Sequence, residues 1–236
     1  FYGWLGLIPI VLLMILIAPI YIAPLFDTFT PLIEKQPDLV PELEKVLARG
    51  GVHIARDRMF EMAASDKVTT YNAYVTGIGA SKRVVVWDNT SRDMTRPETM
   101  FVFGHEMGHY VLQHTVSLLI MNALMIVVAF GLANFLFNWL SKDERWGIRS
   151  VADPAGMPLL FSVIGFIFLL ATPISNNITR FHELQADMFG LNAAREPDGF
   201  AESALLLSEY RKMEPTPFEE WFFYDHPSGY ARIHMA

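Results

Sequence analysis

The sequence predicts a mainly α-helical membrane protein that also carries a polar α+β domain with a small β-sheet. Apolar residues make up 52% of the chain, charged residues only 18%, and the mean hydropathy is +0.28. Three stretches almost free of charge are each long enough to cross a bilayer, which takes about 20 apolar residues in a helix. Short strand-like segments lie in the polar sequence after the first of these stretches.

The apolar stretches divide the chain. We expect transmembrane helices at 1–26, 115–140 and 157–176, a short loop at 141–156, and a polar domain built from 27–114 and 177–236. Two crossings separate the two polar parts, so both lie on the same side of the bilayer and can share one site. The first stretch is unlike a signal peptide because it is long, contains three prolines and lacks a basic start. Since the chain begins inside apolar sequence and without Met, we expect a longer multi-spanning protein.

The polar part 27–114 shows helix and strand signals in sequence. A short helix is expected at 41–49, ended by a Gly-Gly pair. Strands are expected at 58–62, 69–76 and 83–88, and the Gly-containing loop between the last two suits a hairpin. A sheet with an exposed edge can pair with an extended peptide. Thr95, Pro97 and Glu98 then form a capping-box pattern that predicts the start of a helix.

That helix contains the most informative motif of the chain. Residues 105–109 are His-Glu-Met-Gly-His, an H-E-x-x-H pattern. Positions i and i+4 share one face of a helix, so His105 and His109 can offer ring nitrogens to one metal ion. Glu106 can then take a proton from a metal-bound water. Chance predicts roughly 0.01 such pentapeptides in a chain of this composition, and the capped helix supplies the context that the motif needs.

A third metal ligand must come from elsewhere. The chain has no cysteine, so a metal would be held by nitrogen and oxygen, and a catalytic zinc takes three protein ligands plus water. Glu183 and Asp187 follow the third apolar stretch and are four residues apart. One of them could bind the metal while the other accepts a hydrogen bond from a ligating imidazole. An ordinary solvated face shared with Arg180 explains the same spacing, and spacing alone leaves both alternatives open.

Five segments give the chain a resemblance to the type-1 CAAX prenyl protease family of zinc metalloproteases and to the related HtpX-type membrane proteases. They occur in the order typical of the family and extend from the first apolar stretch to the end of the chain. The segments are Phe-Asp-Thr-Phe-Thr-Pro-Leu at 26–32, Asn-Ala-Tyr at 72–74, the motif at 105–109, Glu-Leu-Gln-Ala-Asp at 183–187, and Asp-His-Pro-Ser at 225–228 with Arg232-Ile233 behind it. The first segment favours the prenyl-protease branch. That branch has seven transmembrane helices and a gluzincin-like protease domain, which implies further helices before residue 1.

The resemblance implies a role for each matching residue. His105, His109 and Glu183 would bind one Zn²⁺. Glu106 would be the general base, and Asp187 would orient a ligating histidine. Asn72, Ala73 and Tyr74 would hold the substrate backbone, and His226, with Asn72, would stabilise the oxyanion. This sequence has Asp225 and Ser228 where the family often has Ser and Pro. Asp225 could raise the pKa of His226, or it could pair with Arg232.

The implied function is that of an integral-membrane zinc metalloendopeptidase that cleaves peptides or proteins, including lipidated or membrane-embedded ones. The family's active site faces the cytosol, whereas the three basic residues of the loop 141–156 leave the orientation open. Alternatives are an HtpX-like quality-control protease, a membrane scaffold with a structural metal site, and a non-haem iron oxygenase. Glu106 argues against the scaffold, and the distance in sequence to Glu183 argues against the oxygenase.

The remaining features carry less weight. A net charge of −7 argues against a nucleic-acid partner. We expect the other histidines, at positions 53, 114, 182 and 234, to be surface or interfacial residues rather than ligands. The aromatic cluster 221–224 is expected to pack within the domain.

Overall fold

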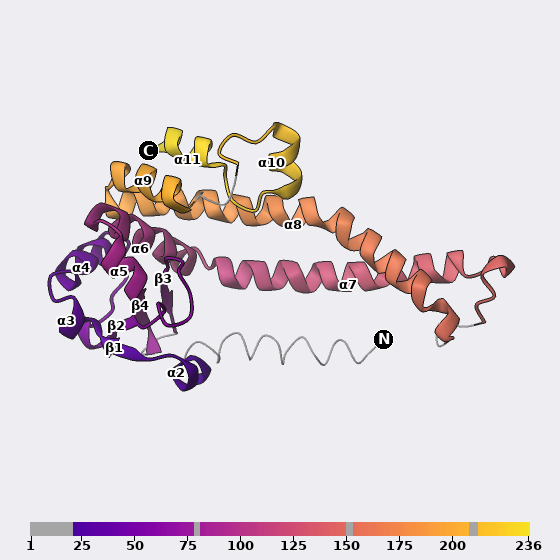
Figure 1. Ribbon diagram of the computed structural model, residues 1–236, viewed down its shortest axis with the longest axis horizontal. Coiled ribbons are helices and arrows are strands. Elements are labelled where there is room, and N and C mark those ends of the chain that lie inside the picture. Colours follow the sequence, from indigo (N-terminus) through magenta and orange to yellow (C-terminus); the bar gives the residue numbers. More distant parts are fainter. Residues whose placement is uncertain (1–20, 78–80, 150–152, 208–211) are drawn as a thin grey trace.

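The computed structural model describes residues 21–77, 81–149, 153–207 and 212–236. The predicted transmembrane helix at 1–26 therefore lies outside the described residues, except for its last few positions. The elements are α2 (Ala23–Phe26), β1 (Phe29–Pro31), α3 (Leu32–Lys35), α4 (Val40–Arg49), η2 (Arg56–Arg58), β2 (Met59–Met62), β3 (Ala73–Thr76), β4 (Arg83–Trp87), α5 (Asp88–Asp93), α6 (Arg96–Val111), α7 (His114–Leu140), η4 (Glu144–Trp146), η5 (Pro154–Gly156), α8 (Met157–Ala194), α9 (Pro197–Leu207), α10 (Pro217–Phe223) and α11 (Gly229–Met235). Figure 1 shows a folded head from which α7 and α8 extend together.

Four strands make a small mixed sheet in the order β1-β2-β4-β3. The strands β2, β3 and β4 confirm the three predicted ones, and β3 pairs antiparallel with β4 as the predicted hairpin requires. The strand β1 was not predicted, because it is only three residues long and ends in Pro31. One face of the sheet packs on α4 and α6 through a core that includes Val84, Val86 and Phe103. Within the described sheet β3 is an edge strand, and it lies against α6.

The helix α6 begins as the sequence predicts. Thr95 Oγ1 accepts a hydrogen bond from the Glu98 backbone N–H, and the Glu98 carboxylate accepts one from the Thr95 N–H. The reciprocal bonds satisfy two of the free donors at the helix start. Most side chains from Glu98 to Gly108 are buried, so this helix crosses the head with core on nearly every side.

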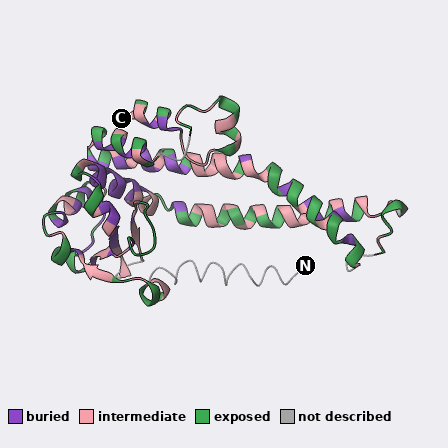
Figure 2. Cartoon of the chain, viewed as in Figure 1, coloured by how far each residue is buried: buried purple, intermediate pink, exposed green. Residues whose placement is uncertain are grey.

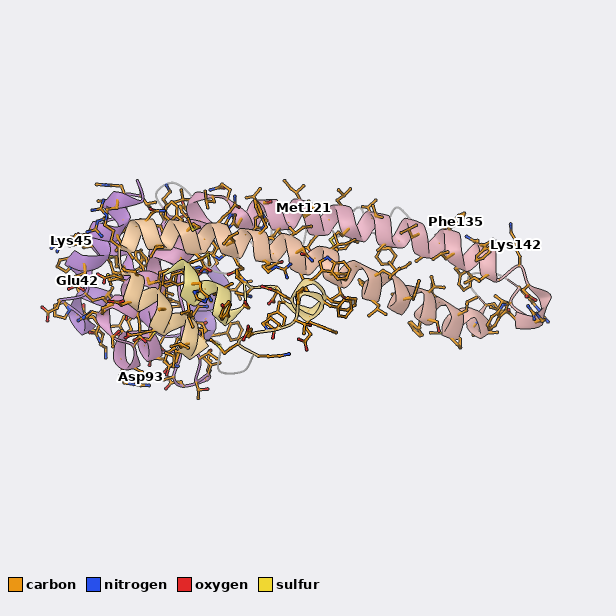
Figure 3. All side chains as sticks on the ribbon, turned by 90° about the horizontal axis from the view of Figure 1, so that it is seen from above. Glu42, Lys45, Asp93, Met121, Phe135 and Lys142 are labelled. Atoms are coloured by element: carbon orange, nitrogen blue, oxygen red, sulfur yellow. The ribbon has the colours of Figure 1, made fainter. Side chains whose placement is uncertain are left out.

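Two described helices, α7 and α8, are long and apolar enough to cross a membrane. They pack on each other at their far ends through Phe137, Val163, Ile167 and their neighbours. Figure 2 shows most other positions of the two helices as exposed or intermediate, and the exposed ones include large apolar side chains such as Leu124, Phe135 and Phe168. In Figure 3, Met121 and Phe135 lie along α7, whereas the labelled charged residues lie in the head or, like Lys142, at the distal end. An apolar surface of this extent is typical of a membrane or protein contact.

The helix α8 is longer than the predicted transmembrane segment at 157–176. It runs without interruption for 38 residues and carries the apolar stretch and the polar Glu183 region on one rod. Pro173 lies inside it and removes one backbone hydrogen bond, and Figure 1 shows the helix bending along its length. The predicted boundary at 176–177 is thus a change of side-chain polarity within one helix.

Candidate metal centre

The close contact of α6 with α8 depends on small residues. Gly104 and Gly108 of α6 face Gly190 and Ala186 of α8. A Cβ atom built on Gly190 would lie 2.7 Å from the backbone nitrogen of His105, so the two backbones approach as closely as glycine permits. This contact brings His105 and His109, which directly follow the two glycines of α6, within reach of Glu183 on α8.

Three predicted ligand side chains converge at this crossing. His105 Nε2 lies 3.1 Å from His109 Nε2. Glu183 Oε2 is 3.3 Å from His105 Nε2, and Glu183 Oε1 is 3.5 Å from His109 Nε2. One ligand atom from each residue lies within 4.8 Å of the other two. The two histidines of the motif and the distant carboxylate of Glu183 therefore meet at one point, as the resemblance implies.

The donor set fits a zinc ion. Two imidazole nitrogens and one carboxylate leave a fourth tetrahedral position for water or substrate, which is the ligand pattern of a catalytic zinc. Glu183 Oε2 is buried and has no hydrogen-bond partner among the described residues. A buried carboxylate oxygen normally has a partner, and a cation at the centre of this group would provide one.

On the far side of His105, Asp187 and Arg232 hold the ring. The Nδ1 atom of His105 lies 2.9 Å from Asp187 Oδ1, and Arg232 of α11 donates to the same oxygen at 2.5 Å. A proton on Nδ1 leaves the Nε2 lone pair directed at the metal centre. The contact of Asp187 is the one that the resemblance implies. Arg232 thus pairs with Asp187.

The protonation of His105 is coupled to metal binding. Burial acts to lower its pKa, but the Asp187 and Glu183 carboxylates outweigh burial and raise the pKa to about 10. Without a metal the ring is therefore charged at neutral pH. A metal must displace the Nε2 proton before it can bind, so binding releases a proton and weakens as the pH falls.

Glu106 lines a pocket of about 250 Å³, and of the three predicted ligands His105 lines it as well. Burial raises the pKa of the Glu106 carboxyl above its ordinary value, while His105 and His109 oppose this shift. The pocket is lined by Tyr71, Asn72, Phe101, Val102, His105, Glu106, Leu207, Tyr224, His226, Pro227, Gly229 and Arg232. It thus brings together the predicted base, the predicted oxyanion group and the residue before the edge strand.

The predicted substrate segment divides between the two faces of the sheet. Asn72 lines the pocket, and its backbone is fixed by Thr90, whose hydroxyl bonds both its N–H and its carbonyl. Ala73 belongs to the main core, whereas Tyr74 packs in the separate cluster on the other face of the sheet. Any contact of Tyr74 with a peptide in the pocket would therefore be made by its backbone.

His226 reaches the metal centre from the loop before α11. Its Nε2 lies 3.2 Å from Glu183 Oε2, and its Nδ1 lies 2.9 Å from Asp225 Oδ1. Of the two alternatives for Asp225, the structure has the contact with His226. Ser228, the other departure from the family pattern, caps α11 by accepting a hydrogen bond from the Ala231 N–H.

Two expectations about histidines were wrong. His114 and His182 are buried, and His114 Nδ1 lies 3.0 Å from His109 Nδ1. Their sequence context gave no sign of this, because His114 contacts His109 only through the turn between α6 and α7. His53 and His234 are exposed, as expected.

Trp221 and Phe223 are exposed, although the aromatic cluster 221–224 was expected to pack within the domain.

The helix crossing gives a direct test of the packing. We expect Gly190→Ala to destabilise the fold by about 1–3 kcal/mol and to weaken zinc binding, because the new methyl group would press on the His105 backbone. Thermal unfolding and zinc content measure the two effects. Gly165→Ala on the same helix is the matched control, since nothing lies within 4 Å of its built Cβ. Equal behaviour of the two variants would contradict the packing argument.

Comparison with known proteins agrees with the resemblance seen in the sequence. The uncharacterized metalloprotease YhfN of Bacillus subtilis is 32% identical over 241 residues, covering 100% of this chain and 55% of that protein. A CAAX prenyl protease 1 homolog of Dictyostelium discoideum is 32% identical over 196 residues, covering 81% and 45%. The crystal structure of S. mikatae Ste24p matches with a TM-score of 0.76 and 25% identity, covering 99% of this chain and 57% of that one.

The chain spans about half the length of the curated relatives that it matches. Within that span the fold is similar to that of S. mikatae Ste24p. The model of peptidase family M48 matches residues 34–236, which contain every predicted ligand. The chain therefore belongs to peptidase family M48.

Proposed function

We propose that this chain carries the active site of a multi-pass membrane zinc metalloendopeptidase. One Zn²⁺ would be held by His105, His109 and Glu183. The observation that carries the proposal is the convergence of these three side chains, together with the pocket that His105 and Glu106 both line. A structural metal site has no need of the adjacent carboxylate, so Glu106 favours catalysis over a scaffold role.

Each side chain has a chemical task in peptide hydrolysis. Zinc, when bound, supplies a Lewis acid that activates water and polarises a carbonyl group. Glu106 accepts the proton of the attacking water and then delivers it to the nitrogen of the leaving amine. The carboxylate therefore ends the reaction in the ionisation state in which it began. Burial raises the pKa of Glu106 toward neutral pH. A group whose pKa lies nearer to the working pH can both accept and return a proton. Asp187 and Arg232 keep the His105 ring in position.

The substrate would lie along the edge of the sheet. An extended peptide can add to β3 as a further strand, with backbone hydrogen bonds that are independent of its sequence. Asn72 at the start of that edge and His226 on the opposite wall both line the pocket. We assign to them the stabilisation of the negative oxygen that forms at the scissile carbonyl.

Lipidated peptides are the substrate class that we favour. Several relatives are named CAAX prenyl protease 1, and the exposed apolar surfaces of α7 and α8 begin next to the site. We propose that these helices cross a bilayer and that the site opens on its cytosolic side. A lipid-bearing peptide would then reach the pocket from the membrane. An HtpX-like protease would use the same residues on unmodified membrane proteins.

A paired assay distinguishes the two substrates. We expect the purified full chain to cleave a farnesylated CAAX peptide at least tenfold faster than the same peptide without the lipid, because burial of the prenyl chain adds binding energy of about 0.8 kcal/mol for each CH₂ group. A chelator should stop both reactions, and added zinc should restore them. Equal rates on the two peptides would contradict lipid specificity and favour the HtpX-like alternative.

A further inference from the structure

The two ligating histidines are supported in different ways. His105 directs its Nδ1 at a carboxylate, which is the common arrangement for a metal-bound histidine. Among the described residues, no carboxylate is recorded at the Nδ1 of His109. Its Nδ1 faces the Nδ1 of His114 at 3.0 Å, and the Nε2 of His114 faces Gln185 Oε1 at 3.2 Å. A chain of three side chains thus leads from the second ligand to α8.

The protons along this chain can be assigned from donors and acceptors. Two facing ring nitrogens need one proton between them. Gln185 presents its oxygen to His114, so the Nε2 of His114 carries a proton and its Nδ1 is the free lone pair. The proton between the rings then belongs to Nδ1 of His109. With that proton in place, His109 presents an unprotonated Nε2 to the metal centre.

The position of His114 is fixed from several sides. It is the first residue of α7 and follows Gln113, whose backbone is left-handed with φ of 59°. After this residue the ring of His114 lies against His109 at the end of α6. Its ring is 2% exposed and stacks on His182 at 4.5 Å between centroids. His182 in turn contacts the hydroxyl of Ser117 at 3.2 Å.

We propose that His114 is a positioning residue that holds His109 in its zinc-binding tautomer, acting as a neutral hydrogen-bond acceptor at Nδ1. This inference rests on the proposed zinc site. In the opposite arrangement His114 would donate to His109, and the proton of His109 would sit on Nε2, where it blocks the metal. Gln185 opposes that arrangement because its oxygen can only accept. The first residue of a long apolar helix is thereby part of the support of the metal centre.

Three variants of the full chain test the proposal, with zinc affinity measured by competition with a coloured chelator. His114→Phe keeps a ring for the stack on His182 but removes the acceptor. We expect its zinc affinity to fall about 10–100-fold, and the visible absorption spectrum of the Co²⁺-substituted protein to change. His114→Asn places an amide oxygen where Nδ1 lies, and should bind zinc more like the parent protein than like His114→Phe. His182→Phe alters the same stack but leaves the acceptor at Nδ1 of His114 in place, and should lower the affinity less than His114→Phe does.

The outcomes separate this inference from the proposed function. Unchanged zinc affinity in His114→Phe would overturn the positioning role. So would equal losses in His114→Phe and His114→Asn, or in His114→Phe and His182→Phe, since either result would mean that only packing matters. If the parent protein bound no zinc, or if Glu183→Gln bound it normally, the metal site itself would be refuted, and the role of His114 with it.

Discussion

Glu106→Gln is expected to abolish peptide hydrolysis while leaving zinc in place. The amide has nearly the shape of the carboxylate but cannot accept a proton from water, and general acid–base catalysis contributes about 10²–10⁴-fold to rates. Glu106 also lies outside the group of three ligands, so its replacement removes no bond to the metal. We therefore expect kcat to fall by about that factor, with one zinc per chain retained.

The measurement needs both a rate and a metal content. Cleavage of a fluorogenic peptide gives kcat, and elemental analysis of the same sample gives zinc per chain. Glu202→Gln is the matched control, because it makes the same chemical change at an exposed position on α9. Full activity in Glu106→Gln would show that another group takes the proton. Loss of zinc would show that Glu106 is a ligand.

Glu183→Gln should have the opposite signature. Here the change removes the only carboxylate among the three converging ligand side chains, and with it a negative charge that offsets the charge of the cation. A neutral amide oxygen is a much weaker ligand for Zn²⁺ than a carboxylate. We expect the zinc content to fall close to zero after dialysis, and activity to be lost with the metal.

Restoring the metal distinguishes weakened binding from a misfolded protein. Excess Zn²⁺ should recover part of the activity of Glu183→Gln but none of that of Glu106→Gln, because only the first variant is limited by occupancy. Circular dichroism of both variants checks that the helices are intact. If Glu183→Gln kept a full complement of zinc after dialysis, the third ligand would have to be another residue.

The sequence predicted best those features that depend on short-range geometry. The i, i+4 spacing of His105 and His109 and the capping box at Thr95 each follow from one helix and its first turn, so both were predictable from local pattern. Glu183 lies 74 residues after His109. Spacing alone left it undecided against a solvated charged face, and the resemblance to a known family identified it.

The features that escaped prediction depend on contacts between elements. Nothing near His114 in the sequence indicates that a left-handed turn at Gln113 places its ring against His109. The length of α8 was underestimated because hydropathy falls after Ile174, while the backbone continues as helix to Ala194. The role of Gly190 is likewise visible only once α6 lies against it, since a glycine in a helical sequence ordinarily suggests weakness rather than a point of contact.

The uninterrupted course of α8 has a mechanical consequence. Its apolar start at Met157 and the carboxylate of Glu183 belong to one rod, roughly 39 Å apart at 1.5 Å per residue. A rod of that length converts a small change of tilt at one end into a displacement at the other. In the bilayer proposed above, the thickness and tension of the lipid would therefore act on the geometry of the metal centre through this helix, with Pro173 as the place where the rod can bend.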